Sequence, residues 1–181
     1  MQADSTLLNA AREMDEAAIV KIFDTYAPAL FNYALRTGND PLIADNIVGD
    51  VFAKLLDQLA RGYGPNSNLR SYLFQMAYHL IVDEVRYSQR RLSLETYELL
   101  PQNGTSEFAG SETRMAFETV LHAIRDELSI SQRHVIVLRF LEGFNIRETA
   151  EILGRSESSV KVTQNRAITV LRKALRHHVV T

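Results

Sequence analysis

Polar and basic side chains near the carboxyl end of the chain are of the types that bind an anionic polymer. Serine and asparagine can hydrogen-bond to base edges, and lysine and arginine can neutralise phosphates. Residues 144–181 carry seven basic and three acidic side chains, although the chain of 181 residues has a formal charge of −2. This asymmetry predicts a DNA-binding segment, and a solvated basic helix without a ligand is the alternative.

Two helices around a glycine turn would position these side chains. Asn145 and Glu148 match a reciprocal capping pair and predict a short helix, which Gly154 ends in a left-handed conformation. Ser156 caps a last helix over 157–177. A short helix, a three-residue turn and a longer helix form the spacing of a helix-turn-helix, whose second helix enters the major groove. A helical hairpin with a solvated basic face is the alternative.

The clearest apolar stripe in the chain lies between residues 40 and 60. Asp40 followed by Pro41 is typical of a helix start, because Asp caps the first amide groups and Pro suits the first turn. The apolar residues after it recur at helical spacing, which predicts one buried and one solvated face. The stripe consists of Ala44, Ile47, Val48, Val51, Phe52 and Leu55. In the first part of the chain, further helices are predicted over 15–25, from Pro28 to about Gly38, and over 69–92 with Asn68 as the cap. In the last part, helices are predicted from Phe117 to Leu128 and over 134–142, the latter with Ser131 as its cap.

The pattern divides the chain into two parts. Residues 93–111 have no helical period, include the stretch PQNGTSEFAGS and are net acidic, which is typical of a linker. Eight glycines and four prolines are too few for the many tight turns of an all-β protein. We predict an all-α protein of two small helical domains, residues 10–92 and 112–178, joined by the linker 93–111.

Several classes of protein are disfavoured by what the sequence lacks. The chain contains no cysteine, so it has no disulfide and no thiolate zinc site. We find no Ser/His/Asp set, phosphate loop or metal-binding box, and we therefore expect no enzyme, no cofactor and no metal. There is no run of about 18 apolar residues, and the amino terminus lacks a basic region before an apolar one. We expect a cytoplasmic protein that does not insert into a membrane.

The carboxyl-terminal segment FLEGFNIRETAEILGRSESSVKVTQNRAITVLRKAL resembles the promoter-binding domain of bacterial sigma factors. The family has a glycine before the first helix, a Glu-(Ile/Thr)-Ala pattern inside it, and a Ser-Val-Lys and an Arg-Ala pair in the second. The matching residues here are Gly143, Glu148–Thr149–Ala150, Leu153–Gly154, Ser156, Ser159–Val160–Lys161 and Arg166–Ala167.

The first domain resembles the other half of the same family. FNYALRTGNDPLIADNIVGDVFAKLL is similar to its polymerase-binding helix pair, and LRSYLFQMAYHLIVDEVR to its promoter-melting helix. The two halves stand in the family's order, which resembles the small extracytoplasmic-function (ECF) group of the sigma-70 family. The resemblance implies a sigma factor that binds RNA polymerase core and directs promoter-specific transcription initiation. A regulator that does not bind polymerase and an adaptor that binds only protein are the alternatives.

The resemblance also implies roles for individual residues. Domain 10–92 corresponds to sigma region 2, and domain 112–178 to sigma region 4. Family members often have an anti-sigma factor as a partner, and no residue here indicates one. The residues that would dock on the clamp helices of the large polymerase subunit are Asp45, Asn46, Gly49, Asp50 and Lys54. The residues that would bind and melt the −10 element are Asn66, Asn68, Tyr78, His79, Asp83, Arg86 and Tyr87. For the −35 element, base reading is expected from Ser158, Ser159, Lys161, Val162, Asn165 and Arg166. Phosphate contacts are expected from Arg147, Arg155 and Arg172, and Ser156 is a further DNA-binding residue.

The chain departs from the family pattern at a few of these positions. Gly49 stands where the family usually has Gln, Tyr72 where it has Trp, and the pair Tyr78–His79 where it often has Arg–Asn. These departures concern the promoter sequence that is read rather than the general role.

Overall fold

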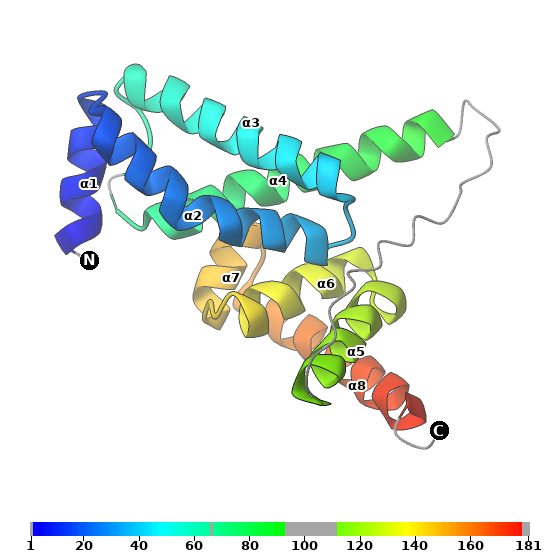
Figure 1. Ribbon diagram of the computed structural model, residues 1–181. Coiled ribbons are helices and arrows are strands. Elements are labelled where there is room, and N and C mark those ends of the chain that lie inside the picture. The colour runs from blue at the N-terminus through cyan, green and yellow to red at the C-terminus, as the bar shows by residue number, and fades with distance from the viewer. Residues whose placement is uncertain (1, 66, 93–111, 179–181) are drawn as a thin grey trace.

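The computed structural model describes residues 2–65, 67–92 and 112–178, and over these residues it is helical with no β-strand (Figure 1). The predicted all-α fold class is confirmed. In chain order the elements are α1 (Gln2–Arg12), α2 (Glu16–Arg36), α3 (Pro41–Ala60), α4 (Leu69–Leu92), α5 (Glu112–Glu127), α6 (Ile130–Ile136), the π-helical turn η1 (Val137–Leu141), α7 (Ile146–Leu153) and α8 (Glu157–His178).

Helices α1 to α4 form the amino-terminal half. The Asp40 carboxylate accepts a hydrogen bond from the Ile43 amide at 2.9 Å, and Pro41 opens α3, as the sequence predicts. All six residues of the predicted apolar stripe of α3 are buried, against α2 on one side and α4 on the other. The opposite face of α3 is therefore left to solvent.

Two expectations for this half are wrong. Residues 16–36 form one helix, and not two, because α2 continues through Pro28. Pro28 lies on the exposed side, while Ile22, Leu30 and Tyr33 bury one continuous face that outweighs the backbone hydrogen bond lost at the proline. The core also begins before residue 10, since α1 buries Leu8 against it.

The carboxyl-terminal half contains the predicted helix-turn-helix. Asn145 and Glu148 form the expected capping box at the start of α7, and Gly154 ends that helix with a φ of 61°. Helix α6 begins earlier than expected, because Ser129 and Gln132 form a second capping box that replaces the predicted cap at Ser131. The stretch predicted as one helix over 134–142 is divided between α6 and η1.

The two halves contact each other instead of standing apart. Helix α4 packs against α7, and α2 packs against α5 and η1, which brings the helix-turn-helix under the first bundle (Figure 1). The buried core is continuous across the contact and includes Tyr33, Phe74 and Phe144. The domain boundaries at 92 and 112 remain a prediction, since the linker 93–111 lies outside the described residues. Within the described part of the chain, no helix combines the length and apolar character needed to cross a membrane.

Candidate functional site

The helix-turn-helix is held by a small buried core and a capped turn. Ala150 on α7 and Val160 and Ala167 on α8 are buried, so the two helices cross closely over small side chains. The Ser156 hydroxyl accepts a hydrogen bond from the Ser159 amide at 3.2 Å, which caps α8 as predicted. This packing fixes one face of α8 inward and turns the other outward.

The outward face of α8 carries most of the residues predicted to read DNA bases. Ser158, Lys161, Val162 and Asn165 recur three or four residues apart and are exposed, and Arg172 continues the same face. Ser159 and Arg166 are exposed at its edge. Val162 is an apolar side chain 49% exposed among polar ones, which suits contact with a thymine methyl group. The structure therefore gathers the base-reading candidates on one surface.

The arginines predicted to contact phosphates differ in their exposure and in their present partners. Arg172 is exposed and lines a hollow of about 450 Å³ together with Thr169, Lys173 and Arg176. Arg147 is exposed and pairs with Glu151 at 3.0 Å, an ion pair that water weakens. Arg155 is half-buried and donates a hydrogen bond to the Ser131 hydroxyl at 2.6 Å, so it also supports the fold of this half.

The predicted polymerase-binding residues form the solvent face of α3. Asp45, Asn46, Gly49, Asp50 and Lys54 are all exposed. A Cβ built at Gly49 meets nothing within 4 Å, so a larger side chain would fit there. Beside this face lies a groove of about 360 Å³ between α3 and α4, whose lining is apolar at its base and acidic at its rim: Ile43, Asn46, Ile47, Asp50, Leu80, Asp83, Glu84 and Tyr87.

The predicted −10 residues do not share one surface. His79, Asp83, Arg86 and Tyr87 lie on one exposed face of α4, where Asp83 and Arg86 are 3.7 Å apart. Tyr78 points the other way and is half-buried, with its ring edge-on to the His134 ring at a centroid distance of 5.0 Å. Asn68 is exposed just before α4, with a φ of 56° that differs from the extended geometry of the predicted helix cap. Asn66 lies outside the described residues.

Each half of the chain matches a known protein family. The model "Sigma-70 region 2" matches residues 22–91, and "Sigma-70, region 4" matches residues 126–173. The chain is 32% identical over 157 residues to the ECF RNA polymerase sigma factor SigX of Bacillus subtilis (strain 168), which covers 84% of this chain and 80% of SigX. The chain belongs to the ECF sigma factors. It therefore binds RNA polymerase core and directs promoter-specific transcription initiation.

A further relative and a similar solved structure of another protein agree with this assignment. The ECF RNA polymerase sigma factor SigL of Mycobacterium tuberculosis (strain ATCC 35801 / TMC 107 / Erdman) is 29% identical over 170 residues, or 92% of this chain and 94% of SigL. A structure of CnrH in complex with the cytosolic domain of CnrY is similar with a TM-score of 0.72 at 22% identity, covering 97% of this chain and 98% of CnrH. A likeness at this identity shows the shared fold.

Two residues of the sigma factor's surface were missed by sequence reasoning. Glu84 lines the groove between α3 and α4 and is not among the residues predicted to form a site. Tyr63 is 70% exposed in the loop before α4, between Gly62 and Gly64. An aromatic residue between two glycines, in the gap between the predicted helices 40–60 and 69–92, was the available signal.

Proposed function

We propose that this sigma factor reads the −35 element with the exposed face of α8. The observation that carries the assignment is the division of α8 into a buried face, with Val160 and Ala167 at 0% exposure, and an opposite polar face. Base reading is assigned to Ser158, Ser159, Lys161, Val162, Asn165 and Arg166, and phosphate contact to Arg147 and Arg172. Ser156 caps α8 and Arg155 ties α6 to the turn, so we propose that these two act mainly by positioning the helix.

We propose that core polymerase docks on the solvent face of α3 and the groove beside it. Asp50 of α3 lines the groove together with Asp83 and Glu84 of α4, and Asp45 is exposed on the same solvent face of α3. Such an acidic rim repels DNA phosphates and favours a basic protein surface, while the apolar base of the groove can bury aliphatic side chains. Asp83 and Tyr87 are thereby proposed as polymerase contacts rather than contacts of the −10 element.

We propose that the exposed residues before and within α4 handle the −10 element. Tyr63 and Asn68 in the loop, and His79 and Arg86 on the helix, can stack on or hydrogen-bond to unpaired bases. The assignment of Asn66 to the same task remains a prediction from the sequence.

In this scheme the chain acts by binding and performs no catalysis, and it acts in the cytoplasm, where polymerase and promoter are found.

An anti-sigma factor is a further proposed partner. A sigma factor of similar fold, RpoE, was solved with the anti-sigma factor NepR from Bartonella quintana, at a TM-score of 0.68 and 21% identity over 86% of this chain and 95% of RpoE. The present chain has a groove of about 420 Å³ between α2 and α5, next to Phe117, which is 43% exposed. We propose this groove as the place where such a partner would bury an apolar side chain.

Run-off transcription with core polymerase and a promoter library tests the proposal. Wild-type protein should support initiation at a defined set of promoters. Asp50→Arg should lower core affinity at least tenfold with an unchanged circular dichroism spectrum, because the residue is exposed and lies off the apolar stripe. Asp24→Arg is the matched control, since Asp24 is exposed on α2 and outside the proposed interface. Equal core affinity of Asp50→Arg and wild type would remove α3 as the docking face.

A further inference from the structure

The loop between α3 and α4, residues 61–68, contains two glycines in left-handed conformations. The backbone angle φ is 77° at Gly62 and 108° at Gly64, values that other residues rarely adopt. Between these glycines Tyr63 is 70% exposed, and its amide donates a hydrogen bond to the Gln58 carbonyl oxygen at 2.8 Å. A segment with two glycines has many conformations available to it when nothing holds it. The contacts that hold this loop therefore decide where the Tyr63 ring lies.

The backbone beside Tyr63 is held by Arg12 of α1. The Arg12 guanidinium donates a hydrogen bond through Nη2 to the Pro65 carbonyl oxygen at 2.9 Å and another to the Gly64 carbonyl oxygen at 3.4 Å (Figure 1). Among the described residues, no other donor reaches these two oxygens. Pro65 is buried, and a Cβ built at Gly64 would lie 3.3 Å from the Leu59 side chain, so this part of the loop packs on the core. Arg12 thus supplies the polar half of an anchor whose apolar half is the core.

The corner between α1 and α2 fixes the position of Arg12. Arg12 is half-buried in the last turn of α1, and Leu8 on the same helix is 1% exposed. Met14 follows with a φ of 59°, and the Asp15 amide donates a hydrogen bond to the Ala10 carbonyl oxygen at 3.1 Å, which closes the end of α1. The Asp15 carboxylate then caps α2. The guanidinium is therefore held by a packed and capped corner and not by a free helix end.

Holding the loop in advance has a consequence for binding unpaired bases. An extruded base has already lost its stacking and pairing, and a loop that must also become ordered adds to the free energy that binding has to supply. Hydrogen bonds from a charged donor are stronger than those between neutral groups, so a guanidinium is suited to ordering a glycine-containing segment. Arg12 precedes the part of the chain that matches region 2, residues 22–91. The brace of this loop therefore comes from a helix outside that match.

We propose that Arg12 is a positioning residue for the −10 element, which holds the backbone at Gly64 and Pro65 so that Tyr63 is presented to an unpaired base. This proposal rests on the −10 role proposed above for Tyr63. Arg12 acts through the loop, because its two hydrogen bonds go to loop carbonyl oxygens. Its loss frees the loop, so promoter opening and base preference at the −10 element decrease. Recruitment to the promoter is unchanged, since core docking and −35 binding use other surfaces.

Substitutions at Arg12 and Tyr63 test this role. Arg12→Met removes the charge and the donors but keeps a long apolar stem beside the core, and Arg12→Lys keeps the charge and a donor. Lys21→Met is the matched control, because Lys21 is an exposed cation on α2 with no side-chain contact to the loop. Tyr63→Ala removes the ring that the loop presents. The double variant Arg12→Met/Tyr63→Ala shows whether the two residues act through one contact, since coupled residues have non-additive effects.

Promoter opening is measured with holoenzyme reconstituted from core polymerase and each full-length variant. The template is a promoter recovered from the library with wild-type protein, and 2-aminopurine in its −10 element reports unpaired bases by fluorescence. We expect Arg12→Met to lower the equilibrium constant for opening about tenfold, the factor typical of one lost hydrogen bond to a charged group. It should also relax base preference at the position that Tyr63→Ala relaxes, with core affinity and −35 binding within twofold of wild type.

The other variants separate positioning from a general defect. Arg12→Lys should keep at least half of the wild-type opening constant, Lys21→Met should match wild type, and the double variant should open within twofold of Tyr63→Ala. Wild-type opening by Arg12→Met, opening by Arg12→Lys no better than by Arg12→Met, or additive losses in the double variant would each overturn the positioning role. A parallel fall in core affinity would also overturn it, because the whole half would then be affected. Wild-type opening by Tyr63→Ala would instead remove the function on which the proposal rests.

Discussion

Acidification should weaken the folded protein through His134. The imidazole is 2% exposed, and burial, with the nearby charges of Arg155 and Arg133, lowers its pKa to about 3 from an ordinary 6.5. Burial also raises the pKa of Tyr33, so its hydroxyl stays protonated and donates to Nδ1 of a neutral His134. Protonation would place an imidazolium among two guanidinium groups and remove the acceptor.

The sign and size of the effect follow from proton linkage. Between pH 6.5 and pH 3 the unfolded chain binds one more proton at this site than the folded chain, so stability falls as the pH falls. The free energy of unfolding should drop by about 2 kcal/mol between pH 7 and pH 5 from this group alone. Glu142 acts in the opposite direction, because the raised pKa of a carboxyl adds stability at low pH that is lost as the pH rises.

Urea unfolding followed by circular dichroism at pH 7 and pH 5 measures the change. His134→Asn keeps an acceptor near the Tyr33 hydroxyl but cannot titrate, and His122→Asn is the control at an exposed histidine. Because every variant retains Glu142, the difference between wild type and His134→Asn isolates the histidine. The pH dependence should shrink in His134→Asn and persist in His122→Asn. Identical pH dependence in all three proteins would show that His134 does not govern this stability.

Further predictions concern the helix-turn-helix and the core-binding face. Gly154→Ala should cost about 1 kcal/mol or more in urea unfolding, because φ at that position is 61°. Arg166→Ala should cost about 1–3 kcal/mol of promoter affinity and relax preference at one base position, as library selection would detect. Arg172→Ala should weaken all sequences alike and reduce the salt slope of binding by about one. Asn46→Arg should weaken core binding in pulldown, since Asn46 lines the acidic groove beside α3.

Local signals in the sequence were sufficient where one short segment determines the geometry. The capping box at Asn145 and Glu148, the left-handed Gly154 and the Asp40–Pro41 start of α3 lie where the pattern predicts them. Each of these features depends on residues within four positions of one another. The expected break at Pro28 was wrong, because burial of a long continuous face outweighed a local preference.

Contacts between the halves could not be predicted, because helical periodicity shows that a residue is buried without showing its partner. Tyr33 and Phe74 fit the apolar faces of their own helices, and His134 is buried on α6. The pairing of Tyr33 with His134 spans 101 positions and no local pattern encodes it. The prediction for Tyr78 met the same limit. The sequence placed Tyr78 with the residues for the −10 element, but its ring packs against His134 of the other half.

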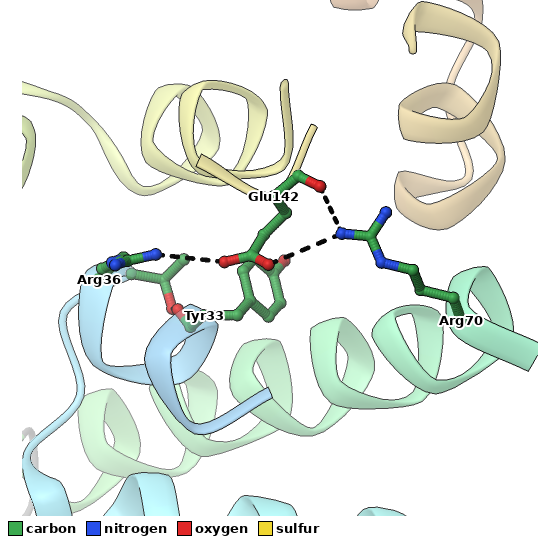
Figure 2. Close-up of polar contacts among 5 residues, drawn as sticks. Tyr33, Arg36, Arg70 and Glu142 are labelled. Atoms are coloured by element: carbon green, nitrogen blue, oxygen red, sulfur yellow. Dashed lines mark hydrogen bonds and ion pairs between the residues drawn. The ribbon is translucent and has the colours of Figure 1, made fainter. Parts of the chain in front are cut away.

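The charge of Glu142 is a feature of the sequence that could have pointed to the contact between the two halves. Glu142 follows the stretch Val135 to Leu141, which is apolar except for Arg139. Arg139 is also the one basic neighbour of the Glu142 carboxylate at helical spacing. Arg139 instead bonds to Gln164 and to the Phe144 carbonyl, which leaves Glu142 to be satisfied from the other half. A buried carboxylate whose cations come from another part of the chain ties the position of one half to the other. Neutralisation of the Glu142 carboxylate by arginines of α2 and α4 (Figure 2) therefore depends on how the two halves are arranged, which no local pattern in the sequence specifies.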